Sequence, residues 1–308
     1  MSQTEETYRV AYQDGYVRLS DVQLHYVDFG GTGEVVLALH GLVGSAHAFD
    51  AIAPLLVPHF RLVGLDLRGR GDSDWGMLET YNFNQYFVDL MGFLAALKLE
   101  RFALLGTSLG GRLARTYAMA HPENVTRLVL NDSALGGGGI AETLAVARGL
   151  AKAPRAFASL EEAAAWFRSE RAGLRRLIAR DLAAWVRHYL APSPTGGWAF
   201  QCDPAIIQGA IPLLLHRPEL AGDPDYPSAV WEKIARLTMP VLIIRGALST
   251  VIPRPSAERL VRALPRARLV EVPGVGHAPT LYEPEAQEAL ADFFGVPACA
   301  AAPATVPV

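Results

Sequence analysis

Short, wholly apolar runs alternate with amphipathic stretches along most of this chain. The apolar runs cover residues 35–39, 62–65, 102–105, 128–130, 241–244 and 269–272. Hydrophobic positions recur with helical spacing in stretches between them, for example 83–97, 109–120 and 257–264. Continuous apolar strands separated by amphipathic helices are typical of a parallel sheet that is covered on both faces. The pattern therefore predicts an α/β fold with a mostly parallel central sheet and helices on both of its faces.

The beginning of the chain has a different pattern. Between residues 16 and 29 apolar and polar positions alternate, and the stretch ends at the pair Gly30-Gly31. Alternation of this kind indicates strands with one face in the core and the other in water. We therefore expect a pair of antiparallel strands ahead of the parallel part of the sheet.

The alternation of strands and helices stops near a run of four glycines, 136–139. The residues that follow have a helical pattern with no convincing strand until about residue 237. We interpret residues 135–237 as a helical insertion, and residues 1–134 and 238–297 as the two parts of the α/β core. The closing stretch, 298–308, consists of small residues and prolines, so we expect a flexible tail there.

Composition and charge narrow the class of protein. The chain has 308 residues, of which 51% are hydrophobic and 19% charged, so it can bury a sizeable core. Its formal net charge of −3 supplies no global attraction to nucleic acid or to an anionic membrane. The first residues are polar and acidic, unlike a signal peptide, and no apolar run approaches the roughly 18 residues of a membrane helix. We expect a cytoplasmic protein without a nucleic-acid or membrane partner; the oligomeric state stays open.

The segment from Phe102 to Gly111 carries the strongest chemical signal. It places the pattern Gly106-x-Ser108-x-Gly110 between an apolar strand and an amphipathic helix. A serine on a sharp strand-to-helix turn has a strained backbone, so the residues two positions away must lack bulk. The helix N-terminus directs amide N–H groups toward any oxyanion formed there. This context is that of a nucleophile elbow, and it predicts that Ser108 is a nucleophile.

A second motif, His40-Gly-Leu-Val-Gly-Ser45, follows the first apolar run. With both motifs the chain resembles the α/β-hydrolase fold family from about residue 16 to residue 294. The resemblance implies an oxyanion hole made by the backbone N–H groups of Leu42 and Leu109. It implies a structural role for His40. The segment 66–73 looks like the family's turn after the next strand, which holds loops beside the site.

The resemblance also implies that the catalytic base comes late in the chain. Here the sequence Val272-Pro-Gly-Val-Gly-His277 follows the last apolar run. A glycine-framed loop at the C-terminal end of a strand can present a histidine over the sheet. We expect His277 to take the proton of Ser108 and then to protonate the leaving group.

The third member of the expected triad departs from the family's pattern. The family usually places an acid a few residues after the strand that corresponds to 241–244, where this chain has Ser249 and Thr250. A hydroxyl can orient an imidazole, but it cannot stabilise an imidazolium with a negative charge. Loss of the carboxylate would cost a large factor in rate.

Another carboxylate, elsewhere in the chain, can take the place of the missing acid. Some branches of the family, including haloalkane dehalogenases, keep the acid after the strand that corresponds to 126–131, and Asp132 follows this strand here. Because a triad is defined by geometry rather than by chain order, we expect Asp132 to be the acid. Another carboxylate, such as Asp203 or Asp225, and the absence of any functional acid remain as alternatives.

The insertion corresponds to the family's cap, which roofs the site and shapes the substrate pocket. It carries several aromatic side chains: Trp166, Phe167, Trp185, Tyr189, Trp198 and Phe200. Some of them must pack the cap itself, and any that line the pocket would favour an apolar small-molecule substrate. The insertion is also rich in arginines interleaved with acids, which is typical of a solvated face. One arginine pointing inward to bind an acidic substrate would instead support C–C bond hydrolysis or a lyase reaction at the same site.

We therefore predict a serine hydrolase that cleaves a carboxylic ester or lactone through an acyl-enzyme. A serine nucleophile argues against a dehalogenase or an epoxide hydrolase, which need a carboxylate at that place. Two alternatives remain: C–C bond hydrolysis or a lyase reaction at the same site, and a non-catalytic ligand-binding protein on this scaffold. Cys202 and Cys299 make no CxxC pair, and metalloprotease, P-loop and dinucleotide motifs are absent, so the sequence implies no metal and no cofactor.

Overall fold

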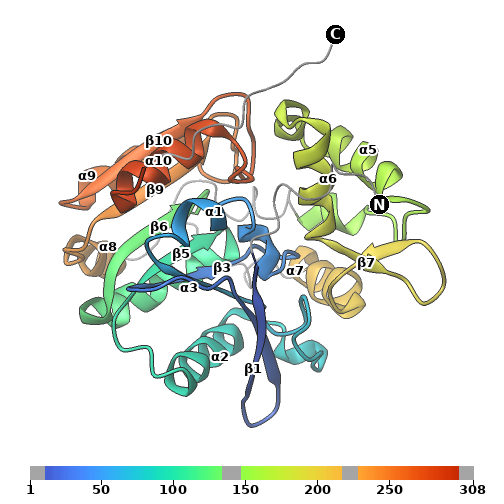
Figure 1. The fold of residues 1–308 in the computed structure, drawn as a ribbon, viewed down its shortest axis with the longest axis horizontal. Helices are drawn as coiled ribbons and strands as arrows, with labels where there is room; N and C mark the ends of the chain where they lie inside the picture. Colours follow the sequence, from blue (N-terminus) through green and yellow to red (C-terminus); the bar gives the residue numbers. More distant parts are fainter. Residues whose placement is uncertain (1–10, 134–146, 217–227, 298–308) are drawn as a thin grey trace.

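A computed structural model describes residues 11–133, 147–216 and 228–297. Its centre is an eight-stranded sheet (Figure 1). The strands are β1 (Gln13–Arg18), β2 (Gln23–Asp28), β3 (Val35–Leu39), β4 (Arg61–Leu65), β5 (Phe102–Thr107), β6 (Val125–Asn131), β9 (Val241–Gly246) and β10 (Ala267–Val272). Their order across the sheet is β1-β2-β4-β3-β5-β6-β9-β10. Strand β2 is antiparallel to β1 and β4, and the other neighbours are parallel. The predicted mostly parallel α/β architecture, with antiparallel strands at its start, is confirmed.

Consecutive residues of the central strands face two separate cores. In β3, Val36 and Ala38 belong to one hydrophobic cluster, whereas Leu37 and Leu39 belong to the other. Successive side chains of a strand point to opposite faces, so a run that is apolar at every position is covered on both sides. Burial on both faces of the sheet therefore accounts for the wholly apolar runs of the sequence.

Helices supply the two covering layers. On one face of the sheet lie α1 (Ala53–Leu56) and α10 (Pro284–Phe294), whose apolar side chains join the cluster of Val36 and Ala38. The other face is covered by α2 (Phe83–Ala96), α3 (Leu109–Ala120), α8 (Ser228–Ala235) and α9 (Arg254–Ala263). Because the strands from β3 onward are parallel, their C-terminal ends lie at a common edge, where the loops that follow them meet.

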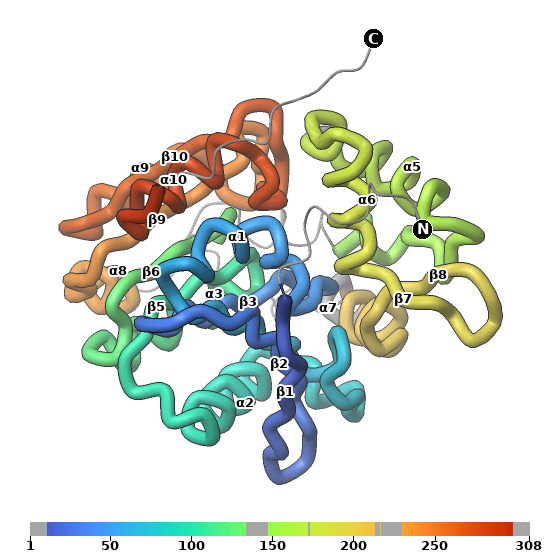
Figure 2. Tube along the Cα trace, in the orientation of Figure 1, coloured from blue at the N-terminus to red at the C-terminus, as the bar shows by residue number. Residues whose placement is uncertain are grey.

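Apart from α8, the described residues between β6 and β9 form a group of elements of their own beside the sheet. These are α5 (Leu160–Glu170), the 3-10 turn η5 (Ala172–Arg176), α6 (Ala179–Arg187), β7 (Leu190–Pro192), β8 (Trp198–Phe200), the π-helical turn η6 (Ile206–Ala210) and α7 (Ile211–His216). In Figures 1 and 2, α5, α6 and β7 lie together beside the central sheet. The division of the chain at residues 134, 237 and 297 remains a prediction.

One expectation for this segment was wrong. We expected no strand in it, but β7 and β8 form an antiparallel pair, and Phe157 adds an isolated bridge to Trp198. Each strand has only three residues, which is too short for a periodic pattern to be recognised. The pairing depends on the turn between them and on tertiary contacts rather than on local pattern.

Most of the aromatic side chains of this segment pack against one another. The ring centroids of Phe167 and Trp185 lie 5.1 Å apart, and those of Trp185 and Tyr189 lie 4.5 Å apart. Phe200 also contacts Phe167, at 5.9 Å. These rings hold α5 and α6 together and build the interior of the segment.

Some expectations fall on residues that the structure does not describe. Cys299, the glycine run 136–139 and the tail 298–308 lie outside the described residues. Cys202 is a free, buried thiol. Among the helices of the described residues, none combines the length and the apolar character needed to cross a membrane.

Candidate active site

Ser108 lies on a sharp turn between β5 and α3. Its backbone angles are φ 52° and ψ −112°, a left-handed conformation that is strained for a residue with a Cβ atom. The turn is tight because its neighbours are glycines. A Cβ atom on Gly106 would lie 2.4 Å from the carbonyl group of Gly110, and one on Gly110 would lie 2.0 Å from the carbonyl oxygen of Leu39. The sequence pattern thus forms the predicted elbow.

Three predicted side chains form a continuous chain of hydrogen bonds. The Ser108 Oγ lies 2.8 Å from Nε2 of His277, and Nδ1 of His277 lies 2.6 Å from Oδ2 of Asp132. Because a carboxylate only accepts, Nδ1 carries the proton and Nε2 is left to accept from the serine hydroxyl. The side chain of Asp132 is fully buried, whereas that of His277 is 10% exposed. The three residues come from loops after β5, β6 and β10, whose C-terminal ends meet at one edge of the sheet.

The Asp132 carboxylate has further donors from the end of β9 and from the loop that follows it. Its Oδ2 accepts a 2.7 Å hydrogen bond from the hydroxyl of Ser249, and its Oδ1 accepts one of 3.2 Å from the Gly246 amide. The Asp132 amide in turn donates to the carbonyl of Ile244 at 2.7 Å. Ser249, which stands where the family usually has an acid, therefore helps to hold the carboxylate that follows the neighbouring strand β6.

Of the two alternative acids, the one that the structure describes, Asp203, has another hydrogen-bond partner than the histidine. Asp203 accepts a hydrogen bond from the hydroxyl of Tyr81, and burial together with this bond raises the pKa of Tyr81. Asp225 lies outside the described residues. Thr250 lines a pocket beside His277 and offers a hydroxyl only.

His40 is buried at the end of β3 and is structural in its contacts. Its Nδ1 donates to the carbonyl of Gly41 at 2.7 Å, and its Nε2 accepts from the amide of Leu67 at 3.0 Å. Burial lowers the pKa of His40 to about 4, so the ring is neutral at pH 7. A neutral ring with one donor and one acceptor joins the loops after β3 and β4.

The turn after β3 lies directly against the elbow. A Cβ atom on Gly41 would lie 3.7 Å from the Cβ of Ser108, and the Gly110 amide donates to the carbonyl of His40 at 3.1 Å. The carbonyl of Leu42 accepts a 3.0 Å hydrogen bond from Nε of Arg70, which fixes this turn from outside. Leu109 is the first residue of α3, where a helix leaves its amides without acceptors of its own.

The segment 66–73 ties these loops together. Asp66 accepts hydrogen bonds from the amides of Ala46 at 2.6 Å and Asp72 at 3.0 Å, and it pairs with the buried ring of His25 at 2.7 Å. Burial lowers the pKa of His25, but the hydrogen bond and the charge of Asp66 outweigh it and raise the pKa above the usual value. This carboxylate makes structural contacts, as expected.

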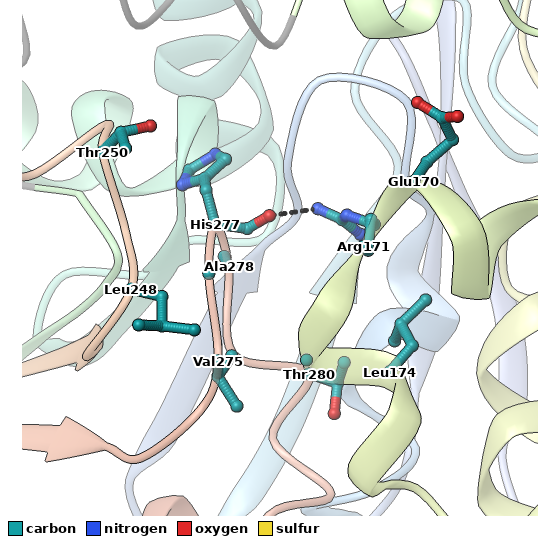
Figure 3. Close-up of a pocket in the computed structure, with 11 residues that line it drawn as sticks. Glu170, Arg171, Leu174, Leu248, Thr250, Val275, His277, Ala278 and Thr280 are labelled. Atoms are coloured by element: carbon teal, nitrogen blue, oxygen red, sulfur yellow. Dashed lines mark hydrogen bonds between the residues drawn. The ribbon is translucent and has the colours of Figure 1, made fainter.

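A pocket of about 210 Å³ opens beside His277 (Figure 3). Its lining comes from the loops after β9 and β10 and from the end of α5 with η5. None of the six aromatic residues singled out in the sequence lines it. Within the described residues, no group of three or more histidine, cysteine or acidic side chains is arranged to hold a metal ion.

Comparisons with known proteins agree on one family. A family model described as alpha/beta hydrolase fold matches residues 34–284. The 3-hydroxybutyrate-oligomer hydrolase of Cupriavidus necator is 30% identical over 292 residues, which cover 91% of this chain and 96% of that protein. The pimeloyl-acyl-carrier-protein methyl ester esterase of Nitrosomonas europaea is 26% identical over 273 residues, covering 84% of this chain and 95% of the esterase.

A solved structure agrees over nearly the whole length. The crystal structure of an alpha/beta hydrolase from Novosphingobium aromaticivorans superposes with a TM-score of 0.79 at 29% identity, covering 92% of this chain and 98% of that one. The family match, the sheet order and the relatives point the same way. This chain belongs to the alpha/beta hydrolase fold family.

Proposed function

We propose that the protein is a serine hydrolase that cleaves a carboxylic ester or lactone through an acyl-enzyme. The observation that carries the proposal is the unbroken hydrogen-bonded series from Ser108 through His277 to Asp132. In this series His277 is the base, and Asp132 is the acid that holds the ring in the right tautomer. We further propose that residues 135–237 act as a cap over the site.

The first half of the reaction forms the acyl-enzyme. The Oγ of Ser108 attacks the ester carbonyl carbon while Nε2 of His277 takes the hydroxyl proton. The carbonyl oxygen becomes an oxyanion, which the amides of Leu42 and Leu109 stabilise by hydrogen bonding. When the tetrahedral intermediate collapses, the C–O bond to the alcohol breaks, and the alcohol leaves with the proton that His277 carried.

The second half releases the acid. A water molecule attacks the acyl carbon while Nε2 of His277 accepts one of its protons. The new tetrahedral intermediate uses the same two amides, and the bond to the Ser108 Oγ then breaks. The proton on His277 returns to Ser108, so the net reaction consumes one water and yields an acid and an alcohol. With a lactone, both groups remain in one product molecule.

One observation supports an ester as the substrate, and another argues against the non-catalytic alternative. The relatives described above include a methyl ester esterase and an oligomer hydrolase, and both match this chain over most of its length. The alternative of a non-catalytic binding protein rests on the absence of an acid at Ser249 and Thr250, where the family usually has one. It loses its basis if Asp132 serves as the acid, and the 2.6 Å contact with His277 supports that role.

A fluorophosphonate probe tests the proposal without knowledge of the substrate. We expect rapid stoichiometric labelling, with the adduct on the peptide that contains Ser108 by mass spectrometry. The His277→Ala variant should lose this labelling because the serine hydroxyl then lacks its base. Folded wild-type protein that resists the probe, or that is labelled equally well without His277, would contradict the proposal.

A further inference from the structure

Arg171 holds an unusual place beside the candidate active site. It is the C-cap residue of α5, and its amide donates to the carbonyl of Phe167 at 2.9 Å. Its side chain reaches across to the loop after β10, where Nη2 donates to the carbonyl of His277 at 2.7 Å (Figure 3). The guanidinium lies over the ring of Trp185, 5.2 Å from the ring centroid. Backbone, ring and carbonyl thus hold the group in one orientation.

The hydrogen-bonding capacity of this guanidinium exceeds what the described residues use. A guanidinium has five N–H groups, and within the described part of the chain its acceptor is the His277 carbonyl. Other arginines, such as Arg68, Arg176 and Arg245, form ion pairs with carboxylates, whereas no described carboxylate lies within 4.0 Å of Arg171.

The free side of the group faces a cavity. Arg171 lines the pocket of about 210 Å³ together with His277 and the hydroxyl-bearing Thr250 and Thr280. Glu170 also lines this pocket, but in Figure 3 its carboxylate extends away from the guanidinium. A fixed cation with unused N–H groups in a cavity of this size is suited to an anionic group of a ligand.

We propose that Arg171 binds a carboxylate of the substrate, so that the enzyme prefers esters that carry a free carboxylate a few bonds from the scissile ester. This deepens the proposed function and rests on it. One residue, His277, contacts both Ser108 through its ring and Arg171 through its carbonyl, so a single residue separates the guanidinium from the serine. The planar fork of arginine matches the two oxygens of a carboxylate.

The opposite interpretation is that Arg171 serves only to fasten the cap to the histidine loop. Arg176 supplies the matched control, because it fastens the same loop without lining the pocket. It donates to the carbonyl of Pro273, and it pairs with Glu285 at 2.7 Å. Loss of Arg176 therefore weakens a contact with the loop but leaves the charge in the pocket unchanged.

Two matched ester pairs distinguish where the carboxylate lies in the substrate. Mono-4-nitrophenyl glutarate and 4-nitrophenyl pentanoate differ by a carboxylate on the acyl part. The butanoate ester of 3-hydroxypropanoate and propyl butanoate differ by a carboxylate on the alcohol part. For each pair the measured quantity is the ratio of kcat/KM for the charged ester to kcat/KM for the neutral one, so that general losses of activity cancel.

We expect Arg171→Gln to lower this ratio at least tenfold in one of the pairs, and Arg176→Gln to leave it within twofold of wild type. Glu170→Gln should raise the ratio, because it removes a negative charge from the lining of the same pocket. An unchanged ratio in Arg171→Gln, or a wild type without preference for either charged ester, would overturn the proposal.

Different experimental results would contradict the proposed anion site and the proposed hydrolase function. Labelling of Ser108 by a fluorophosphonate needs no carboxylate. A protein that is labelled but shows no charge preference lacks the anion site, whereas a folded protein that is not labelled lacks the hydrolase activity itself.

Discussion

The carboxylate of Asp132 is held by three groups from two segments of the chain. It accepts hydrogen bonds from His277, from Ser249 and from the Gly246 amide, and its side chain has no exposed surface. Donors on both oxygens restrain rotation of the carboxylate, so one oxygen stays directed at the imidazole. A hydroxyl at residue 249 is therefore compatible with the proposed mechanism, because it donates to the proposed acid rather than replacing it.

Asp132→Asn should lower kcat by about 10⁴-fold while the fold is kept. The amide that replaces the carboxylate favours the wrong tautomer of His277 and leaves the imidazolium without a counter-charge. Steady-state kinetics with a chromogenic ester measure the loss, and the melting temperature measures the fold.

Thr250→Asp is the companion variant, since it returns a carboxylate to the family's usual place. We expect no more than a few-fold change in kcat, because the position beside His277 Nδ1 is already filled by Asp132. A gain of a hundredfold or more in this variant, or near wild-type turnover in Asp132→Asn, would remove Asp132 from the mechanism.

How far the sequence predicts the site depends on how local each feature is. Ser108 and His277 are marked by glycine patterns within a few residues, and the structure brings both side chains together. Asp132 follows a strand without any local motif, so it could only be one candidate among several. In the sequence, Ser249 marks only the place where the family's usual acid is missing. That its hydroxyl is buried and donates to Asp132 depends on the contact between two strands that are far apart in the sequence, so no sequence pattern indicates it.

At the scale of elements, the elbow depends on the close approach of strand β5 to the first turn of α3. Gly106→Ala should abolish labelling of Ser108 and lower the melting temperature, because the added methyl would lie 2.4 Å from backbone atoms of Gly110 and Gly111. Backbone cannot move aside as a flexible side chain can, so the turn must open.

Gly149→Ala is the matched control for that substitution. Gly149 is helical, and a Cβ atom there would have no neighbour within 4 Å. Alanine is the better helix former by about 1 kcal/mol, so this variant should keep its labelling and melt no lower than wild type. Retained labelling in Gly106→Ala would mean that the elbow tolerates a wider turn than its contacts indicate.

Elements with a continuous apolar or helical pattern were predictable, and those held by tertiary contacts were not. The six apolar runs lie within β3, β4, β5, β6, β9 and β10. The pair β7–β8 escaped prediction because Leu190–Pro192 and Trp198–Phe200 are too short to show a period. Their formation depends on each other and on the bridge between Phe157 and Trp198.

At the scale of the whole molecule, the segment between β6 and β9 contacts the core on two sides of the site. Arg171 reaches the His277 loop on one side. On the other side, the backbone of Gln201 and Asp203 is hydrogen-bonded to the turn of Gly69 and Gly71. The residue between those glycines, an arginine, in turn holds the turn that contains Leu42. A movement of this segment would therefore displace both His277, the proposed base, and Leu42 of the proposed oxyanion hole.

The stability of the whole fold should also depend on pH through one buried residue, His40. Burial lowers its pKa to about 4 against an ordinary 6.5; Arg70 adds to this effect, whereas the charge of Asp66 and the Gly41 carbonyl oppose it. Between these two values the unfolded chain binds more protons at this residue than the folded protein does. Stability therefore rises with pH across this window and falls on acidification, by about 2 kcal/mol between pH 7 and pH 5.

Urea unfolding of wild type and His40→Gln at pH 7, 6 and 5 isolates this contribution. Two other buried residues do not add to the loss of stability on acidification. The pKa of His25 is raised, so its contribution to stability is fully present below its unfolded pKa. Burial raises the pKa of Glu283, and its protonation on acidification therefore favours the folded state. Both residues are common to the two proteins, so the difference between their slopes belongs to His40. We expect His40→Gln to be less stable at pH 7, where it lacks the paired ring, but to lose less on going to pH 5. Parallel pH dependence of the two proteins would mean that His40 is protonated in the folded state, and that its contact with the Leu67 amide does not persist in solution.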